Sequence, residues 1–98
     1  MNYNLLIRRQ AKRDLQRAAK YYEKQLAGLG RDFVTEIDKV LERIEQNPLL
    51  YQAVYRGVRR AVANKFPYGV FYKIDRKDIV VFAIVHLHRD VSSWQDRL

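Results

Sequence analysis

The sequence predicts an α+β fold in which a helical hairpin lies on one face of an antiparallel sheet. Apolar residues alternate at period two from Phe66 to Ile74, and after a polar break the run Ile79–Val85 is apolar without interruption. Upstream, a short glycine-containing link joins two amphipathic stretches, which is typical of an antiparallel helix pair. With a short strand at the N-terminus, the predicted element order is β-α-α-β-β-β.

One strand is predicted before the helices and three after them. Residues 3–7 predict an edge strand, whose position in the sheet the sequence leaves open. Residues 58–64 predict a strand in which Arg59 and Arg60 point to opposite faces. Short turns connect this strand to the two apolar strands described above, so the three should form an antiparallel meander. The uninterrupted apolar strand is expected to be covered on both faces.

The two amphipathic stretches define two helices. The first, Gln10–Leu26, carries an apolar stripe, and Lys and Arg fill the rest of its surface. Residues 27–30 should end it, because glycine suits a left-handed cap. The second helix, residues 31–46, should end at Asn47-Pro48, because the residue before proline disfavours helical backbone. Residues 49–57 are predicted to be a connector.

The tail of the chain is predicted to form one helical turn. Ser92 or Ser93 could cap this turn, which would carry Trp94 and Arg97. Trp94 follows a buried strand closely, and we therefore expect its indole to pack against the end of the sheet.

Length and composition limit the function classes. The chain has 98 residues, which predicts one domain spanning residues 1–98. It has no cysteine, which excludes disulfides, Cys-ligated zinc and thiol catalysis. No apolar run is long enough to span a bilayer or to act as a signal core, so we expect a cytoplasmic protein without a membrane partner.

The net charge is +8, and it is unevenly distributed. Residues 1–30 carry +5 and residues 49–77 carry +6, whereas residues 31–48 carry −2 and residues 78–98 carry −1. Such a field attracts a polyanion or an acidic protein partner. The alternative is that the charge serves solubility alone.

The whole pattern resembles the RelE/ParE superfamily, the toxins of type II toxin–antitoxin modules that are often described as plasmid stabilisation proteins. The resemblance covers nearly the whole chain, and its most specific parts are Phe66-Pro67-Tyr68 with the aromatic strand after it, and His86-x-His88-Arg89-Asp90 with Trp94. The other matching positions are Ala11, Asp14-Leu15, Tyr21-Tyr22, Arg31-Asp32-Phe33, Asn47-Pro48, Val58-Arg59-Arg60, Phe71-Tyr72 and Ile79…Val85.

The resemblance implies the fold more firmly than the activity, because the superfamily contains two mechanisms. RelE-like members cut mRNA in the ribosome, whereas ParE-like members poison DNA gyrase and are not nucleases. RelE-like nucleases tend to carry Arg where this chain has Gly69, and a catalytic Tyr near the position of Trp94. Both departures weaken the nuclease interpretation, and the Phe66-Pro67-Tyr68 start and the Arg89-Asp90 ending look more like the ParE side. The resemblance then implies a toxin without a cofactor that binds DNA gyrase and forms a hetero-oligomer with a cognate antitoxin.

A ribosome-dependent, metal-independent mRNA endonuclease remains the alternative. It needs a general base, a general acid and cations for the phosphate. His86 and His88 could supply acid and base, because imidazole titrates near neutrality, and Tyr68 or Tyr72 could stack on a base. Five cations are candidates for contacting phosphate or a protein target, namely Arg59, Arg60, Lys65, Lys73 and Arg89. In the nuclease hypothesis Arg89 is the third catalytic candidate beside His86 and His88. Independently of that hypothesis, we expect the packing of Trp94 to place Arg89 outward beside Arg59 or Arg60.

The same residues also have structural interpretations. His86 could donate a hydrogen bond at the end of the sheet, and Arg89 could pair with Asp90 or Asp96. His86 and His88 are spaced to face one metal ion, but only Asp90 offers a third ligand, so no metal site is predicted.

The basic, aromatic-rich surface also suits an antitoxin tail that wraps the helices and sheet. We assign antitoxin binding to Tyr51 and Tyr55 in the connector and to Arg13 and Arg17 on the first helix. A weaker alternative is a module that binds nucleic acid through charge alone, which steep salt dependence would reveal.

Overall fold

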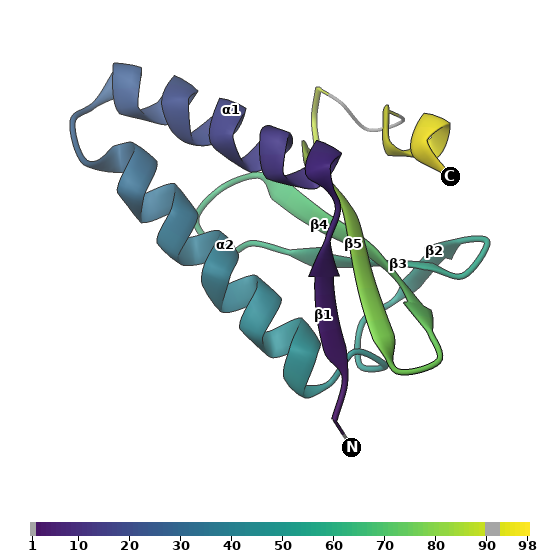
Figure 1. Cartoon of the computed structure of the whole chain (residues 1–98). Coiled ribbons are helices and arrows are strands. Elements are labelled where there is room, and N and C mark those ends of the chain that lie inside the picture. Colours follow the sequence, from purple (N-terminus) through teal and green to yellow (C-terminus); the bar gives the residue numbers. More distant parts are fainter. Residues whose placement is uncertain (1, 90–92) are drawn as a thin grey trace.

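The computed structural model describes residues 2–89 and 93–98, which form a sheet with two helices on one face (Figure 1). No helix within the described residues is long and apolar enough to cross a membrane. The elements are β1 (Asn4–Ile7), α1 (Arg9–Gln25), α2 (Leu29–Gln46), β2 (Ala53–Tyr55), β3 (Val58–Val62), β4 (Tyr68–Asp75), β5 (Asp78–His86) and the 3-10 helix η1 (Ser93–Arg97).

The predicted α+β fold is confirmed, and the sheet has the strand order β1-β5-β4-β3-β2. The N-terminal strand β1 lies at one edge, as predicted, and pairs in parallel with β5 from Asn4–Asp78 to Ile7–Val81. The other neighbouring strands pair antiparallel. β1 is the one strand whose direction departs from an antiparallel sheet, because the helical hairpin carries the chain away before the meander begins.

The predicted connector contains a strand that the sequence pattern did not indicate. β2 pairs with β3 through Ala53–Arg59 and Tyr55–Val58, and it occupies the second edge of the sheet. The strand has only three residues, which is too short for an alternation of apolar and polar residues to be recognised. Arg56 and Gly57 make the turn into β3, both with positive φ.

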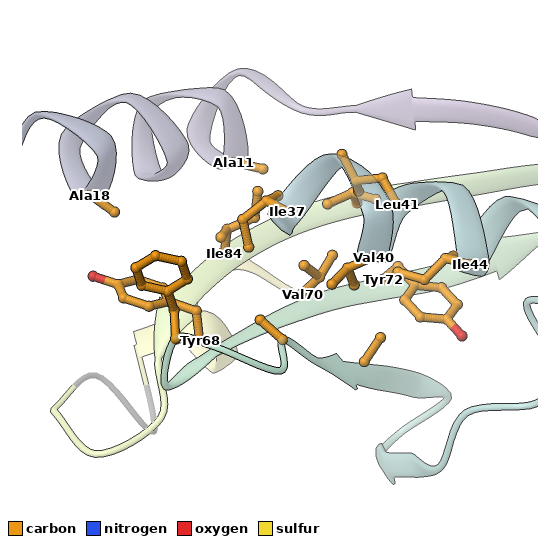
Figure 2. Close-up of a cluster of buried hydrophobic side chains, with 14 of the residues drawn as sticks. Ala11, Ala18, Ile37, Val40, Leu41, Ile44, Tyr68, Val70, Tyr72 and Ile84 are labelled. Atoms are coloured by element: carbon orange, nitrogen blue, oxygen red, sulfur yellow. The ribbon is translucent and has the colours of Figure 1, made fainter. Parts of the chain in front are cut away.

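The main core lies between the helices and the sheet (Figure 2). Alternate residues of β4 face the helices as predicted, with Tyr68, Val70 and Tyr72 buried and Phe66 joining them from the preceding turn. Figure 2 shows Tyr68, Val70 and Tyr72 on the side of the sheet that faces the two helices. The helix residues in this layer are Ala11, Ala18, Phe33, Ile37, Val40, Leu41 and Ile44.

A β-bulge divides β5. Phe71 pairs with Ala83 and Tyr72 pairs with Val81, so Phe82 has no partner on β4. The extra residue reverses the alternation of side chains along β5. Before the bulge Val81 belongs to the helix-side core, and after it Ile84 does, whereas Phe82 and Ala83 belong to a second cluster. The prediction that this apolar strand is covered on both faces is confirmed.

The second cluster lies on the sheet face opposite the helices and is closed by Trp94 of η1. Trp94 is 5% exposed. Its ring stacks on Phe71 at 4.7 Å and 20° and meets the edge of Tyr55 at 5.9 Å. The expected packing of Trp94 against the sheet is confirmed, and it anchors the C-terminal segment.

The helix boundaries differ slightly from the predicted ones, and the role of Gly28 changes. Leu26 is the C-cap of α1, while Gly28, with φ of 90°, is the N-cap of α2, which begins two residues earlier than predicted. Glu23 accepts hydrogen bonds from the backbone N–H groups of Gly28 and Gly30, at 2.9 and 3.0 Å. A Cβ at Gly30 would lie 2.6 Å from the carbonyl oxygen of Ala19, so only glycine allows the helices to approach this closely.

Replacement of Trp94 by alanine should destabilise the protein strongly. Removing a buried aromatic ring leaves a cavity, and we expect the free energy of unfolding to fall on the order of 3 kcal/mol or more. Urea unfolding measures this loss. Gln95→Ala, an exposed neighbour on η1, is the control and should stay within about 0.5 kcal/mol of the parent. Equal stability of the two variants would contradict the packing role of Trp94.

Alkaline pH should destabilise the fold through Tyr72. Its hydroxyl donates a hydrogen bond to the carbonyl oxygen of Pro48 at 2.6 Å. Burial raises the pKa of Tyr72 from 10.0 to about 12, and the charge of Arg59 offsets this only in part. The folded chain therefore keeps the proton longer than the unfolded chain does. The contribution of Tyr72 to the free energy of unfolding should be fully present below about pH 10, and it should be lost as the pH rises toward about 12.

The Tyr72→Phe variant isolates this effect. It should be about 1–2 kcal/mol less stable than the parent near neutral pH, because the carbonyl of Pro48 loses its donor. Near pH 11 the parent should have lost roughly 1.4 kcal/mol through Tyr72, so most of the difference disappears. Urea unfolding of both proteins near pH 9 and pH 11 checks this. A difference that does not change with pH would contradict it.

Candidate functional site

A buried carboxylate on α1 completes the edge of β5. β1 pairs with β5 only as far as Val81, so the next part of that edge has no neighbouring strand. Asp14 fills the gap, since its Oδ2 accepts a hydrogen bond of 3.0 Å from the backbone N–H of Ile84. A buried N–H group without a partner would be costly, and Asp14 thereby fixes α1 on the sheet.

The same carboxylate holds the C-terminal segment. The Arg97 guanidinium meets Asp14 through two contacts, Nη1–Oδ2 at 2.5 Å and Nη2–Oδ1 at 3.0 Å. Arg97 Nη1 also donates to the carbonyl oxygen of Phe82, the bulge residue, at 3.2 Å. The side chains are 8% exposed for Asp14 and 19% exposed for Arg97, so the pair is largely withdrawn from water. Figure 1 shows the C-terminal segment returning beside the start of α1.

A cleft of about 330 Å³ opens next to this pair, between α1 and the end of β5. We call it the α1–β5 cleft. Apolar side chains form part of it, and two tyrosines and three arginines form much of the remainder. Its lining residues are Asp14, Arg17, Ala18, Tyr21, Tyr68, Ile84, Val85, Arg89 and Arg97.

Arg89 lies against the aromatic residues of α1. Its guanidinium carbon is 5.5 Å from the ring centre of Tyr21, a cation–π geometry. Burial raises the pKa of neighbouring Tyr22, and the positive charge of Arg89 acts in the opposite direction. Arg89 is itself exposed, so its charge is available at the mouth of the cleft.

The five cations that are candidates for contacting phosphate or a protein target lie on different elements of the structure. Arg59 lies on the helix side of β3, where it donates to the carbonyl oxygens of Tyr51 at 2.5 Å and Leu49 at 3.5 Å. It therefore fixes the segment that precedes β2. Arg60 points to the opposite face, as the alternation predicts, and its Cγ lies beside Gly69.

The remaining cations are separated as well. Lys65 is exposed in the turn between β3 and β4. Lys73 is exposed on β4 and lines a different pocket, beside Arg8 and Arg97. The expected position of Arg89 beside Arg59 or Arg60 is wrong, because the turn after β5 directs it to α1.

The two histidines lie close together without joining Arg89 in one site. The rings of His86 and His88 are 5.7 Å apart, and Nδ1 of His86 accepts a hydrogen bond of 3.1 Å from the backbone N–H of His88. His86 also meets the ring of Tyr68 edge-on at 5.2 Å. Arg89 lines the α1–β5 cleft, but neither histidine does.

The tyrosines proposed to stack on a nucleobase belong to the core. Tyr72 is 0% exposed and offers no ring face to a ligand, while Tyr68 is 7% exposed and contributes only a small part of the lining of the α1–β5 cleft. No group of three His, Cys, Asp or Glu suited to a metal ion occurs among the described residues. Asp90, the third ligand considered for the histidines, lies outside them.

The four residues assigned to antitoxin binding lie on two distant parts of the surface. Arg13 and Arg17 are exposed on α1, which packs on β5. Tyr55 is 38% exposed on β2, at the far edge of the sheet, and Tyr51 is partly buried against the core. One compact ligand could not contact both parts, whereas an extended segment could.

Sequence reasoning assigned no role to Asp14 or Tyr21 and treated Arg97 as part of the tail. One signal for Asp14 was present. It is the only acidic residue among residues 1–22, and it stands three residues after Ala11 on the apolar stripe of the helix. A lone carboxylate there predicts a buried cation partner. Nothing in the sequence indicated that the partner would be Arg97.

The fold is shared with toxins of toxin–antitoxin complexes. The structure described as the chromosomal ParDE system from P. aeruginosa superposes with a TM-score of 0.78 at 18% identity, covering 86% of this chain and 95% of that chain. The RelBE2 toxin–antitoxin complex from Mycobacterium tuberculosis gives 0.60 at 20% identity, covering 88% and 99%. Among curated proteins, none matches the chain closely enough to count as a relative.

The sequence identifies the family within this fold. The family model described as the ParE toxin of the type II toxin–antitoxin system parDE matches residues 5–91. The chain therefore belongs to the ParE toxin family, within the RelE/ParE superfamily. The resemblance stated from the sequence is confirmed, and the protein is a toxin of the type II toxin–antitoxin class.

The Asp14–Arg97 pair should be energetically coupled. Asp14→Asn keeps an acceptor for Ile84 but loses the charge that Arg97 faces, and we expect stability to fall by about 2–3 kcal/mol. A double-mutant cycle with Arg97→Gln tests the pair, and the double variant should be more stable than the sum of the single losses predicts. Asp96→Asn, exposed on η1, is the control. Strictly additive losses would show that the contact contributes nothing.

Proposed function

We propose that this toxin acts in the cytoplasm by binding DNA gyrase, without catalysis of its own, and that a cognate antitoxin neutralises it. Membership of the ParE family supports the proposal, and so does the fold shared with the ParDE system. The net charge of +8 suits an acidic partner segment.

The observation that carries the proposal is the structure around Gly69 and Trp94. A Cβ at Gly69 would lie 2.9 Å from Cδ2 of Leu87 and 3.2 Å from the ring of Phe71. The arginine expected of a RelE-like nuclease at this position would clash there unless the neighbours moved. Trp94 takes the place expected for a catalytic tyrosine, and it is stacked on Phe71 with 5% exposure. An indole held in this way has no group that transfers a proton.

The proposed antitoxin contacts are extended. For an antitoxin segment that extends from α1 to β2, we propose contacts with Arg13 and Arg17 on α1 and with Tyr51 and Tyr55 near β2. In both structural neighbours the described assembly is a toxin–antitoxin system or complex. We propose a hetero-oligomer of the same kind here.

The direct test combines growth and supercoiling. Induction of the toxin alone should arrest growth while cellular mRNA stays intact, and the purified protein should block DNA supercoiling by gyrase. Unaffected supercoiling at a large excess of folded toxin would exclude gyrase as the target.

Arg89 is the residue we propose for target contact. It is exposed and forms no ion pair within the described residues, so Arg89→Ala should keep the melting temperature while lowering toxicity. Lys77→Ala, an equal loss of charge at the β4–β5 turn, should leave toxicity unchanged. Growth curves after induction and thermal melts separate the two effects. Unfolding of Arg89→Ala, or full toxicity, would show that Arg89 has no role in target binding.

Cleavage of mRNA is the second candidate, and the adjacent rings of His86 and His88 favour it. Primer extension on cellular mRNA after induction distinguishes it. Cuts at fixed codon positions that disappear in His88→Ala would establish the nuclease and replace the gyrase proposal.

A further inference from the structure

We propose that the α1–β5 cleft binds an acidic side chain of the cognate antitoxin, with Arg17 and Arg89 holding its carboxylate. This inference rests on the proposed function and specifies one contact of the neutralising segment. It assigns the carboxylate contact to Arg17 and not to Arg13, because Arg17 lines the cleft and Arg13 does not.

The charge in the cleft is the first argument. Among the described residues, the carboxylate that lines the cleft is Asp14, and it is engaged by both Nη atoms of Arg97 and by the N–H of Ile84. Arg17 and Arg89 line the same cleft, and within residues 2–89 and 93–98 neither forms an ion pair. In this part of the chain the cleft therefore presents two cations that no described carboxylate neutralises. Arginine is suited to such a place because its planar group grips a carboxylate at two points.

The shape and lining of the cleft are the second argument. Its volume of about 330 Å³ lies at the small end of ligand pockets, about 300–1,000 Å³. It therefore suits one or two side chains. Ala18, Ile84 and Val85 supply apolar surface for a methylene stem, while the Tyr21 ring holds the Arg89 guanidinium from one side. An aspartate or glutamate matches this combination of an apolar stem and a terminal anion.

Binding of an antitoxin carboxylate in the cleft would also affect how the toxin contacts its target, because of the position of Arg89. Arg89 is also the residue that we propose for target contact. A carboxylate bound in the cleft would therefore occupy Arg89 and remove it from the target surface. Neutralisation would then follow from competition for one guanidinium, without a change in the fold of the toxin.

Binding of short peptides to the folded toxin tests the inference directly. The probe is the acetylated and amidated peptide Glu-Glu-Glu-Glu, and the matched control is Gln-Gln-Gln-Gln. Amide and side-chain NMR signals of Arg17, Tyr21 and Arg89 should shift with the glutamate peptide and not with the glutamine peptide. Arg17→Gln should weaken the binding about tenfold, the effect of one lost charge-assisted contact.

Arg9→Gln is the matched control variant, because it removes the same charge from an exposed position on the same helix outside the cleft. Its affinity for the glutamate peptide should stay within about twofold of the parent. Equal weakening by Arg9→Gln and Arg17→Gln would overturn the inference in favour of general electrostatic attraction. Stronger shifts of the same signals by inorganic phosphate than by the peptide would overturn it in favour of a phosphate site. Absence of shifts at these residues would also overturn it.

The outcome does not depend on the toxicity of the protein. The peptide titration needs only the folded chain, so a toxin that leaves gyrase unaffected can still show the carboxylate site. Conversely, a toxin that blocks gyrase but gives no shifts at Arg17 and Arg89 refutes the cleft and leaves the proposed function intact.

Discussion

The buried ion pair between Asp14 and Arg97 is the interaction on which the rest of the structure depends. Asp14 stands where β1 leaves the edge of β5, and its carboxylate replaces the missing strand at Ile84. Arg97 reaches the same carboxylate and the carbonyl of the bulge residue Phe82. One carboxylate therefore connects the helix α1, the strand β5 and the C-terminal turn. Removing either charge would leave the other poorly solvated, which is why such pairs strongly constrain structure.

This pair also forms part of the neighbouring cleft. Asp14 lines the same cleft as Arg17 and Arg89. Arg97 engages both oxygens of Asp14. The interaction that stabilises the fold therefore lies beside the two arginines that we propose for carboxylate binding. The bulge at Phe82 contributes to this interaction, since it turns Ile84 toward α1 and exposes a carbonyl to Arg97.

The fold alone does not specify the activity of this chain. The ParDE and RelBE2 structures share its architecture at only 18% and 20% identity. The features that bear on mechanism are therefore local. A side chain at Gly69 would require Leu87 and Phe71 to move, and Trp94 is packed on Phe71. The family relation and these two positions point in the same direction.

The sequence by itself determined the two helices, four of the five strands and the faces that they bury. Periodicity of apolar residues is a local signal, and long amphipathic stretches express it strongly. The three-residue β2 was missed because so short a segment carries no period.

The candidate site was only partly predictable from the sequence. Arg17 and Arg89 were recognised as exposed cations, but their meeting with Tyr21 in one cleft depends on how α1 crosses β5. The tertiary structure also assigned Arg59 to the connector and Arg97 to Asp14, because pairings between residues far apart in the chain leave no periodic trace in the sequence.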